Sequence, residues 1–424
     1  MLNRTLAPES KQVDDINFIE PLKQILDNGI PVFTINAGKQ ELVRIEFIFE
    51  NVNWDAKKPL QAIGVSHLVN NGTALLSAKE IADKVDYYGA FLQTEYGADQ
   101  TCVKLYTLNK HLVSVLPIIR SILNESIFPE QELAIFVQNQ KQSLQVNLQK
   151  NDFLARKQFA NTLFGETPYG SNIGAADYDA LTRAELISYF KAAYKPQNCT
   201  IFVAGKFEEK EFDTLNGIIG KDWNNTEISV INKFSFAAVP GGDVLIERAD
   251  AIQSAIRMGT LAINRNHPDF PGFQVLNCVL GGYFGSRLMA NIREDKGYTY
   301  GIGSAVASLK NAGYFFIATE VGANVCSSAL TEIEKEISLL KTELVADEEL
   351  ALVRNYMLGA MLGSLENAFS HADKFKNVYF SGLDYSYYEN YIETVKTITA
   401  PELKALANKY LNTDTFTRVV VGKN

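Results

Sequence analysis

Two segments of the chain, about half its length apart, follow the same plan. Residues 181–206 read LTRAELISYFKAAYKPQNCTIFVAGK, and residues 398–423 read ITAPELKALANKYLNTDTFTRVVVGK. Each begins with a capping box, a Thr followed three residues later by a Glu, in which the two residues satisfy each other's amides. Each continues as an amphipathic helical pattern, crosses a polar turn and enters an apolar strand pattern that stops at Gly-Lys. The period is too long for a solenoid, so we expect two tandem homologous domains.

The segments around the repeat predict an α+β fold. Residues 42–50, LVRIEFIFE, alternate polar and apolar side chains, as in a strand with one buried face and one face in water. Arg44 and Glu46 belong to the wet face in this interpretation. Helical patterns such as residues 329–343 do not alternate strictly with the strands, which favours two mainly antiparallel sheets, each covered on one face by helices. The predicted divisions are an N-terminal domain at 1–222, a turn-rich linker at 223–240 and a C-terminal domain at 241–424.

Charge and hydropathy argue against some classes of function. The formal net charge of -9 argues against a nucleic-acid-binding protein, which needs a concentrated basic face. No stretch of about 18 apolar residues is present, so no membrane span is expected. Residues 1–20 show no secretory signal pattern, and the four cysteines are scattered, as reduced core thiols would be. A cytoplasmic protein is therefore expected, although a periplasmic protein whose leader had been removed would have the same sequence.

Three segments resemble one family of peptidases. Residues 128–133, FPEQEL, precede a long polar helical stretch at about 130–163, and residues 163–198 read LFGETPYGSNIGAADYDALTRAELISYFKAAYKPQN. Residues 280–304 read LGGYFGSRLMANIREDKGYTYGIGS. Together these segments resemble the pitrilysin/insulysin-type inverzincins, the family of mitochondrial processing peptidase and insulin-degrading enzyme. The resemblance covers nearly the whole chain and implies the tandem α+β architecture that the repeat predicts.

The zinc motif of that family is degenerate in this chain. The resemblance implies H-x-x-E-H on a helix, in which two His side chains bind zinc and the Glu is the general base. The matching residues read His67-Leu68-Val69-Asn70-Asn71, so only the first His remains. Asn70 cannot act as a base because an amide has no useful basicity near neutral pH, and Asn71 is a poor zinc ligand. We therefore expect no metal in this chain, with His67 held by packing or a hydrogen bond instead.

Two further features support the loss of the zinc site. The resemblance implies a third zinc ligand, a Glu on the long helical stretch, but residues 134–164 contain Asp152 as their only acidic residue. The chain also reaches Gly72 sooner than the family pattern would, so the motif helix should be shortened. Elsewhere, His371 and Asp373 are close in sequence, and we interpret them as a surface pair rather than a site.

The C-terminal segment keeps an Arg followed by Gly-x-x-Tyr. The resemblance implies that these two residues hold the substrate and polarise its carbonyl, and the matching residues are Arg293 and Tyr300. A guanidinium and a phenol hydroxyl are both hydrogen-bond donors, suited to a developing oxyanion. The alternative is that Arg293 is an ordinary ion-pair partner and Tyr300 an aromatic residue at a strand edge. The resemblance also implies that substrate adds a strand to a sheet edge, for which residues 89–97, with Gln93 and Thr94, are the candidate.

The leading hypothesis is a catalytically deficient pseudoenzyme of this peptidase family. It would pair as a heterodimer with a zinc-bearing homologous subunit, act on a peptide or unfolded-protein substrate, and contribute Arg293 and Tyr300. This chain would then need no cofactor of its own, and zinc would be held by the partner. The alternative is a structural or interaction protein of the same fold, like the core subunits of respiratory complexes that resemble this family. A zinc peptidase with an unrecognised site is the third possibility.

Overall fold

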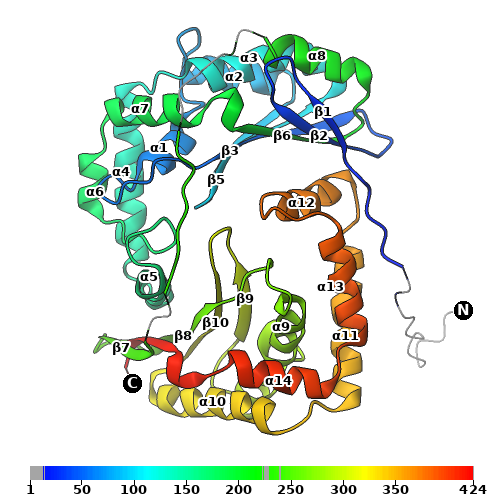
Figure 1. The fold of residues 1–424 in the computed structure, drawn as a ribbon. Coiled ribbons are helices and arrows are strands. Elements are labelled where there is room, and N and C mark those ends of the chain that lie inside the picture. The colour runs from blue at the N-terminus through cyan, green and yellow to red at the C-terminus, as the bar shows by residue number, and fades with distance from the viewer. Residues whose placement is uncertain (1–12, 14, 222, 224–228, 238–239, 424) are drawn as a thin grey trace, which may run out of the picture.

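The computed structural model describes residues 13, 15–221, 223, 229–237 and 240–423. Within them the chain forms two sheets with helices packed around each (Figure 1). In spatial order, the first sheet contains β1 (Leu22–Ile25), β2 (Pro31–Asn36), β6 (Cys199–Gly205), β3 (Leu42–Glu50), β5 (Gln100–Leu108) and β4 (Phe91–Tyr96). The second contains β7 (Gly242–Glu247), β11 (Thr417–Gly422), β8 (Gln253–Ala262), β10 (Gly313–Gly322) and β9 (Ile302–Ser308). Both sheets are antiparallel except at β2–β6 and β7–β11, which confirms the predicted α+β class.

The helices follow the two sheets along the chain. The first group is α1 (Gln61–Leu68), α2 (Ala78–Tyr87), α3 (Leu112–Glu125), α4 (Glu130–Asn147), α5 (Asn151–Phe164), α6 (Ala175–Ala180), α7 (Arg183–Ala193) and α8 (Glu209–Ile219). The second group is α9 (Phe270–Asn277), α10 (Cys326–Thr342), α11 (Asp347–Gly363), α12 (Ala368–Tyr379), α13 (Ser386–Thr397) and α14 (Ala400–Tyr410). The long helical stretch expected at about 130–163 is therefore two helices, α4 and α5. In the described part of the chain, no helix has the length and apolar character needed to cross a bilayer.

The predicted repeat is visible in the local structure of both halves. Thr182 Oγ1 accepts from the Glu185 amide at 3.3 Å and the Thr182 amide donates to Glu185 Oε2 at 3.1 Å, which starts α7. Thr399 and Glu402 make the same pair of hydrogen bonds at the start of α14. α7 and α14 lead into β6 and β11, which lie beside the parallel partner strand in their respective sheets. The two halves therefore share one backbone plan.

Both of these strands end at a glycine. Gly205 and Gly422 have φ angles of +122° and +136°, which only glycine adopts readily. A Cβ at Gly205 would lie 2.2 Å from the carbonyl oxygen of Leu42, and a Cβ at Gly422 would lie 2.6 Å from Ser254 Oγ. These close approaches, together with the positive φ angles, explain why a glycine stands at the end of both strands.

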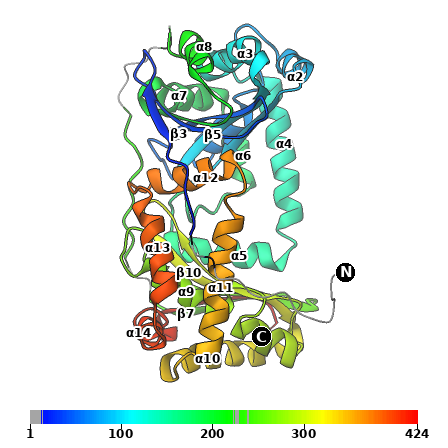
Figure 2. The same ribbon diagram turned by 90° about the vertical axis from the view of Figure 1, so that its right-hand side faces the viewer.

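One helix of each half packs against the sheet of the other half. α5 lies on β8 and β11 of the second sheet, and α12 lies on β2 and β6 of the first sheet (Figures 1 and 2). The α5 contact is a cluster of buried apolar residues: Ala155, Phe159, Leu163 and Phe164 against Ala255, Val419 and Val421. The prediction that helices cover each sheet on one face is therefore incomplete, because the second face of each sheet receives a helix from the other half.

The α12 contact has an apolar part, in which Phe375 and Val378 pack against Phe33 and Phe202, and in addition a buried charged part. The prediction that Arg44 and Glu46 face water is wrong, because α12 covers this face of β3 and leaves them 4% and 0% exposed. Arg44 Nη2 lies 3.1 Å from Glu46 Oε2 and 2.8 Å from Asp373 Oδ1. Lys376 Nζ lies 2.9 Å from Glu46 Oε1, and Lys104 Nζ lies 3.4 Å from the same atom. Each buried charge in this cluster has a partner of opposite sign, as burial requires.

His371 and Asp373 are not the predicted surface pair. His371 is 7% exposed, its Nδ1 accepts from the Ile19 amide at 3.2 Å, and burial lowers its pKa. Asp373 belongs to the charged cluster. Desolvation acts to raise the pKa of Asp373, but hydrogen bonds and charges from Arg44 and Lys376 outweigh it and hold that pKa below its usual value.

The segment between the halves is partly packed against the first half. Ile231 forms an isolated antiparallel bridge with Val52. Residues 224–228 and 238–239 of the predicted linker at 223–240 lie outside the described residues. The boundaries of the three predicted divisions stay a prediction.

Candidate functional site

The degenerate motif lies at the end of a short helix. α1 ends at Leu68, with Val69 as its C-cap, so Asn70 and Asn71 lie in the turn that follows. The helix therefore stops before both Asn residues, and its shortening relative to the family pattern stays a prediction. Residues four apart share a helix face only where the helix continues through both of them. Asn71 consequently does not occupy the place of a second ligand beside His67.

The side chains at these positions have partners within the chain. Asn71 Nδ2 donates to Glu132 Oε2 at 2.9 Å. His67 remains exposed, but its ring lies against Phe136 with centroids 5.3 Å apart, and this loss of hydration lowers the pKa of the imidazole. Glu132 and Phe136 both belong to α4. Glu132 was not among the residues predicted from the sequence, because the third ligand was expected within residues 134–164. Its place in the first turn of the long helix was the signal that could have identified it.

These residues do not fit a zinc ion. The donor set would consist of one imidazole, two amides and a carboxylate that already accepts a hydrogen bond from Asn71. Zinc in proteins is bound by thiolates, imidazoles and carboxylates, and amides are not among its usual ligands. Across the residues that the structure describes, no group of three or more His, Cys, Asp or Glu side chains could hold a metal ion. We therefore assign no chemical step to a metal at α1.

Arg293 lies near the end of a π-helical segment, Met289–Asp295. Its guanidinium lies over the ring of Phe284, with 4.6 Å between the guanidinium carbon and the ring centroid. Its Nη1 is 3.8 Å from Glu294 Oε1, which is too far for a hydrogen bond. About one third of the side chain, 34%, is exposed. The cation–π contact therefore orients the guanidinium, and its N–H groups can reach an acceptor on another molecule.

Tyr300 lies between this π-helical segment and β9, and it is 93% exposed. The backbone on both sides of it is held in place. Thr299 Oγ1 donates to the carbonyl oxygen of Glu320 at 2.7 Å and accepts from the Gly301 amide at 3.1 Å. Arg293 thus lies in the π-helical segment and Tyr300 in the residues that join this segment to β9, and both side chains are accessible.

The strand expected to receive a peptide, β4, lies at the edge of the first sheet. It pairs with β5, with Gln93 opposite Lys104 and Thr94 opposite Val103. Its other side carries backbone N–H and C=O groups that could pair with an added strand. α1 packs beside β4, so the edge strand and the degenerate motif are neighbours.

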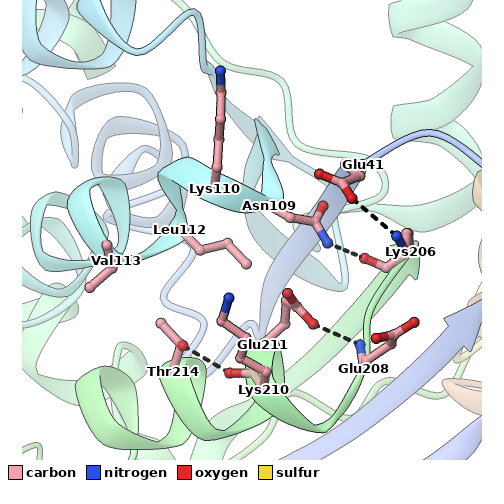
Figure 3. Close-up of a pocket in the computed structure, with 10 residues that line it drawn as sticks. All are labelled: Glu41, Asn109, Lys110, Leu112, Val113, Lys206, Glu208, Lys210, Glu211 and Thr214. Carbon is pink, nitrogen blue, oxygen red and sulfur yellow. Dashed lines mark hydrogen bonds and ion pairs between the residues drawn. The ribbon is translucent and has the colours of Figure 1, made fainter.

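A separate hollow of about 360 Å³ lies between α8 and the segment that leads into α3, where the residues drawn in Figure 3 line it. Its charged groups mostly interact with one another or with nearby backbone. Lys206 Nζ lies 3.1 Å from Glu41 Oε1, and Glu211 Oε2 accepts from the Glu208 amide at 3.1 Å. The hollow is lined by none of the predicted site residues, and we assign it no function.

Comparisons with known proteins show which family and which folds this chain is similar to. Residues 180–357 match the family described as Peptidase M16 inactive domain. An uncharacterized zinc protease of Rickettsia felis is 24% identical over 406 residues, covering 94% of this chain and 97% of that protein. A peptidase M16 inactive domain structure from Pseudomonas fluorescens aligns with a TM-score of 0.85 and 22% identity, over 95% of this chain and 98% of that one. A chain of complex III2 from Candida albicans aligns with a TM-score of 0.73 and 14% identity, over 95% of both chains.

The resemblance to this peptidase family that the sequence predicted is confirmed. The segment at 180–357 matches the peptidase M16 inactive domain family, and the two-sheet fold is shared with the peptidase M16 inactive domain structure from Pseudomonas fluorescens. The matched segment contains Arg293 and Tyr300. The degenerate motif at α1 lies outside it.

Proposed function

We propose that this chain is the catalytically deficient subunit of a two-chain zinc peptidase. It pairs with a zinc-bearing homologous subunit and contributes Arg293 and Tyr300 to substrate binding and oxyanion stabilisation. The observation that best supports this is a contrast: Asn71 is hydrogen-bonded inside the chain, whereas Tyr300 is 93% exposed on a well-held backbone. A side chain with that exposure contributes little to the core, so its place in a family motif favours a role toward another molecule.

Arg293 and Tyr300 are suited to a peptide carbonyl. A guanidinium offers several N–H donors and a permanent charge, and a phenol offers one O–H donor. Negative charge develops on the carbonyl oxygen during hydrolysis, and donors already in place stabilise it without reorganisation. The contact of Arg293 with Phe284, at 4.6 Å, holds the guanidinium before the substrate arrives. Hydrolysis itself would take place at the partner's site, where zinc would supply the activated water.

The edge strand β4 supports an extended peptide or an unfolded protein as the substrate. Backbone hydrogen bonds to an added strand provide affinity that depends little on the substrate's sequence. β4 lies beside α1. The resemblance to the family predicts that a peptide adds a strand at a sheet edge, for which β4 is the candidate. A cytoplasmic location and the absence of a nucleic-acid partner remain predictions from composition.

A second candidate function is a structural or interaction role without proteolysis. It is favoured by the likeness to the complex III2 chain of Candida albicans, with its TM-score of 0.73, together with the degenerate motif. Arg293 and Tyr300 would then be ordinary surface residues. Replacing either one would leave the activity of any partner unchanged.

The experiment that separates these functions is a native purification. The chain is tagged in its own host and recovered, and the eluate is assayed on an unstructured peptide with and without a zinc chelator. We expect a co-purifying homologue with an intact H-x-x-E-H and a chelator-sensitive cleavage that the isolated chain lacks. Recovery of the chain alone, or with unrelated proteins and no cleavage, would contradict the proposed function.

A further inference from the structure

A groove with a volume of about 830 Å³ runs along α4. Its other walls are Lys157 of α5 and the residues Gly174 and Ala175 at the start of α6. Figure 2 shows the angle at which α4 and α5 meet. The first turns of α4 carry Glu132 and Phe136, which contact the degenerate motif. The groove lies farther along the same helix.

Glutamine side chains form one rim of this groove. Gln138, Gln142 and Gln145 follow the i, i+4, i+7 spacing that places them on one face of α4, and Gln149 follows in the next turn. All four residues are exposed. Their side-chain amides make no hydrogen bond with any residue that the structure describes. Each amide therefore keeps a free carbonyl acceptor and a free N–H donor.

The floor of the groove is apolar, and its charged groups are already paired. Val137, Leu144 and Leu148 line it and are half-buried. Lys141 Nζ lies 2.5 Å from Asp179 Oδ1. Lys157 Nζ donates to the carbonyl oxygen of Ile173 at 2.5 Å. The groove thus offers hydrogen bonds and apolar contact, with little unpaired charge to attract an ionic ligand.

We infer that this groove binds an extended polypeptide segment through its backbone. A peptide group carries one N–H donor and one C=O acceptor, which match the donor and acceptor of a Gln amide. The step from Gln138 to Gln145 is about 10.5 Å along a helix axis, close to the roughly 10 Å that three residues span in an extended strand. Small side chains of the bound segment would contact Val137 and Leu144. The inference rests on the proposed function only for the class of occupant, a polypeptide.

The test uses the full chain without any partner. The probe is a fluorescein-labelled peptide of about eight uncharged residues, long enough to span the Gln row at about 3.3 Å per residue. Fluorescence anisotropy gives its Kd for the unchanged chain and for a variant carrying Gln138→Ala, Gln142→Ala and Gln145→Ala. We expect the triple variant to bind at least about tenfold more weakly, because several backbone hydrogen bonds are lost. A second probe with alternate N-methylated amides should lose binding to the unchanged chain.

The matched control lies on another face of the same helix. Asn139 and Ser143 are exposed and do not line the groove, so a variant with Asn139→Ala and Ser143→Ala should bind as the unchanged chain does. Gly174→Trp should also block the groove, since a Cβ there meets only Asp177 Oδ2, at 3.8 Å. Equal binding by the triple variant, or by the N-methylated probe, would overturn the inference. Arg293→Ala should leave this binding unchanged. Failure of the groove inference can therefore be distinguished from failure of the proposed function.

Discussion

Helices α5 and α12 occupy corresponding places, each on the sheet of the other half, and both bury apolar side chains there, but the α12 contact also contains a buried cluster of ion pairs. α5 buries Phe159 against β8 and β11. α12 also buries an apolar side chain, Phe375, against Phe33 and Phe202. In addition it brings Asp373 and Lys376 to Arg44 and Glu46. Apolar contact depends on buried area and accepts modest changes of shape, whereas a buried charge is costly once its partner is removed. The shared backbone plan therefore determines where each helix packs on the opposite sheet. The side chains determine which interactions stabilise that packing.

The two candidate sites also differ, in whether their side chains are hydrogen-bonded inside the chain or exposed. In the first half, helix α1 ends at Leu68 and Asn71 is hydrogen-bonded to Glu132. In the second half, Arg293 and Tyr300 are open to another molecule. The motif side chains of the first half are thus partnered inside the chain, whereas the second half presents two accessible hydrogen-bond donors, which the proposed function assigns to the substrate.

The largest expected effect comes from removing the central carboxylate of the charged contact. Glu46→Ala leaves Arg44, Lys104 and Lys376 close together without the carboxylate they surround. We expect a loss of about 3–5 kcal/mol in the free energy of unfolding, measured by urea denaturation, with faster amide exchange in α12. The matched control is Glu247→Ala at an exposed position of β7, which should change stability by less than about 0.5 kcal/mol. Similar effects of the two variants would contradict the role of the charged cluster.

A smaller effect is expected from a change of shape in the apolar contact. Phe159 belongs to α5, and Phe159→Leu keeps an apolar side chain in the contact with β8 and β11. We expect the free energy of unfolding to fall by about 1.5 kcal/mol or less. The same denaturation experiment measures it. The loss should not vary between pH 5 and pH 8, because the charged group beside the ring, the Arg257 guanidinium at 5.8 Å from its centroid, stays protonated throughout this range. If Phe159→Leu were as costly as Glu46→Ala, the distinction between the two crossings would not hold.

A still smaller effect is expected at the exposed end of the charged cluster. The side chain of Asp373 is 45% exposed, so Asp373→Asn should cost about 1 kcal/mol or less at pH 7. The folded-state pKa of Asp373 is lowered. Its contribution is therefore complete above its unfolded pKa of about 3.9 and is lost as the pH falls through the lower folded value. Unfolding measured between pH 7 and pH 3 should show the two proteins converging in acid, and a constant difference would contradict this.

The smallest expected effect concerns the lost zinc motif. Asn70→Glu combined with Asn71→His restores the residue types of H-x-x-E-H, but α1 still ends at Leu68. We expect the metal-to-protein ratio after purification without added zinc to stay near zero, measured by atomic absorption. The unchanged chain should give the same result. A ratio near one in the unchanged chain would support a zinc site that the sequence does not reveal.

Local features of the fold could be predicted from the sequence because they depend on neighbouring residues. The capping boxes at Thr182 and Thr399, and the helix-to-strand plan that follows each of them, could be predicted from local patterns. The burial of Arg44 and Glu46 could not be predicted, because the helix that covers them lies more than 300 residues away in sequence. An alternating pattern shows that two faces differ, but it does not show whether water or a charged helix covers the polar one.

The candidate site was predictable to a similar extent. Arg293 and Tyr300 could be singled out from the sequence, because they stand in a segment in which an Arg is followed by Gly-x-x-Tyr. The contact of Arg293 with Phe284 and the hydrogen bond from Asn71 to Glu132 depend on tertiary packing that no local pattern reveals.

The measurement that tests the central claim most directly is the turnover of the two-chain complex carrying Tyr300→Phe. This variant removes one O–H donor and leaves the ring, so assembly should be unchanged while turnover falls by about tenfold to a thousandfold. Tyr87→Phe is the matched control, because Tyr87 is also largely exposed, at 82%, and lies outside the proposed site. A complex with Tyr300→Phe that assembles and cleaves peptide at the unchanged rate would contradict the role assigned to this residue.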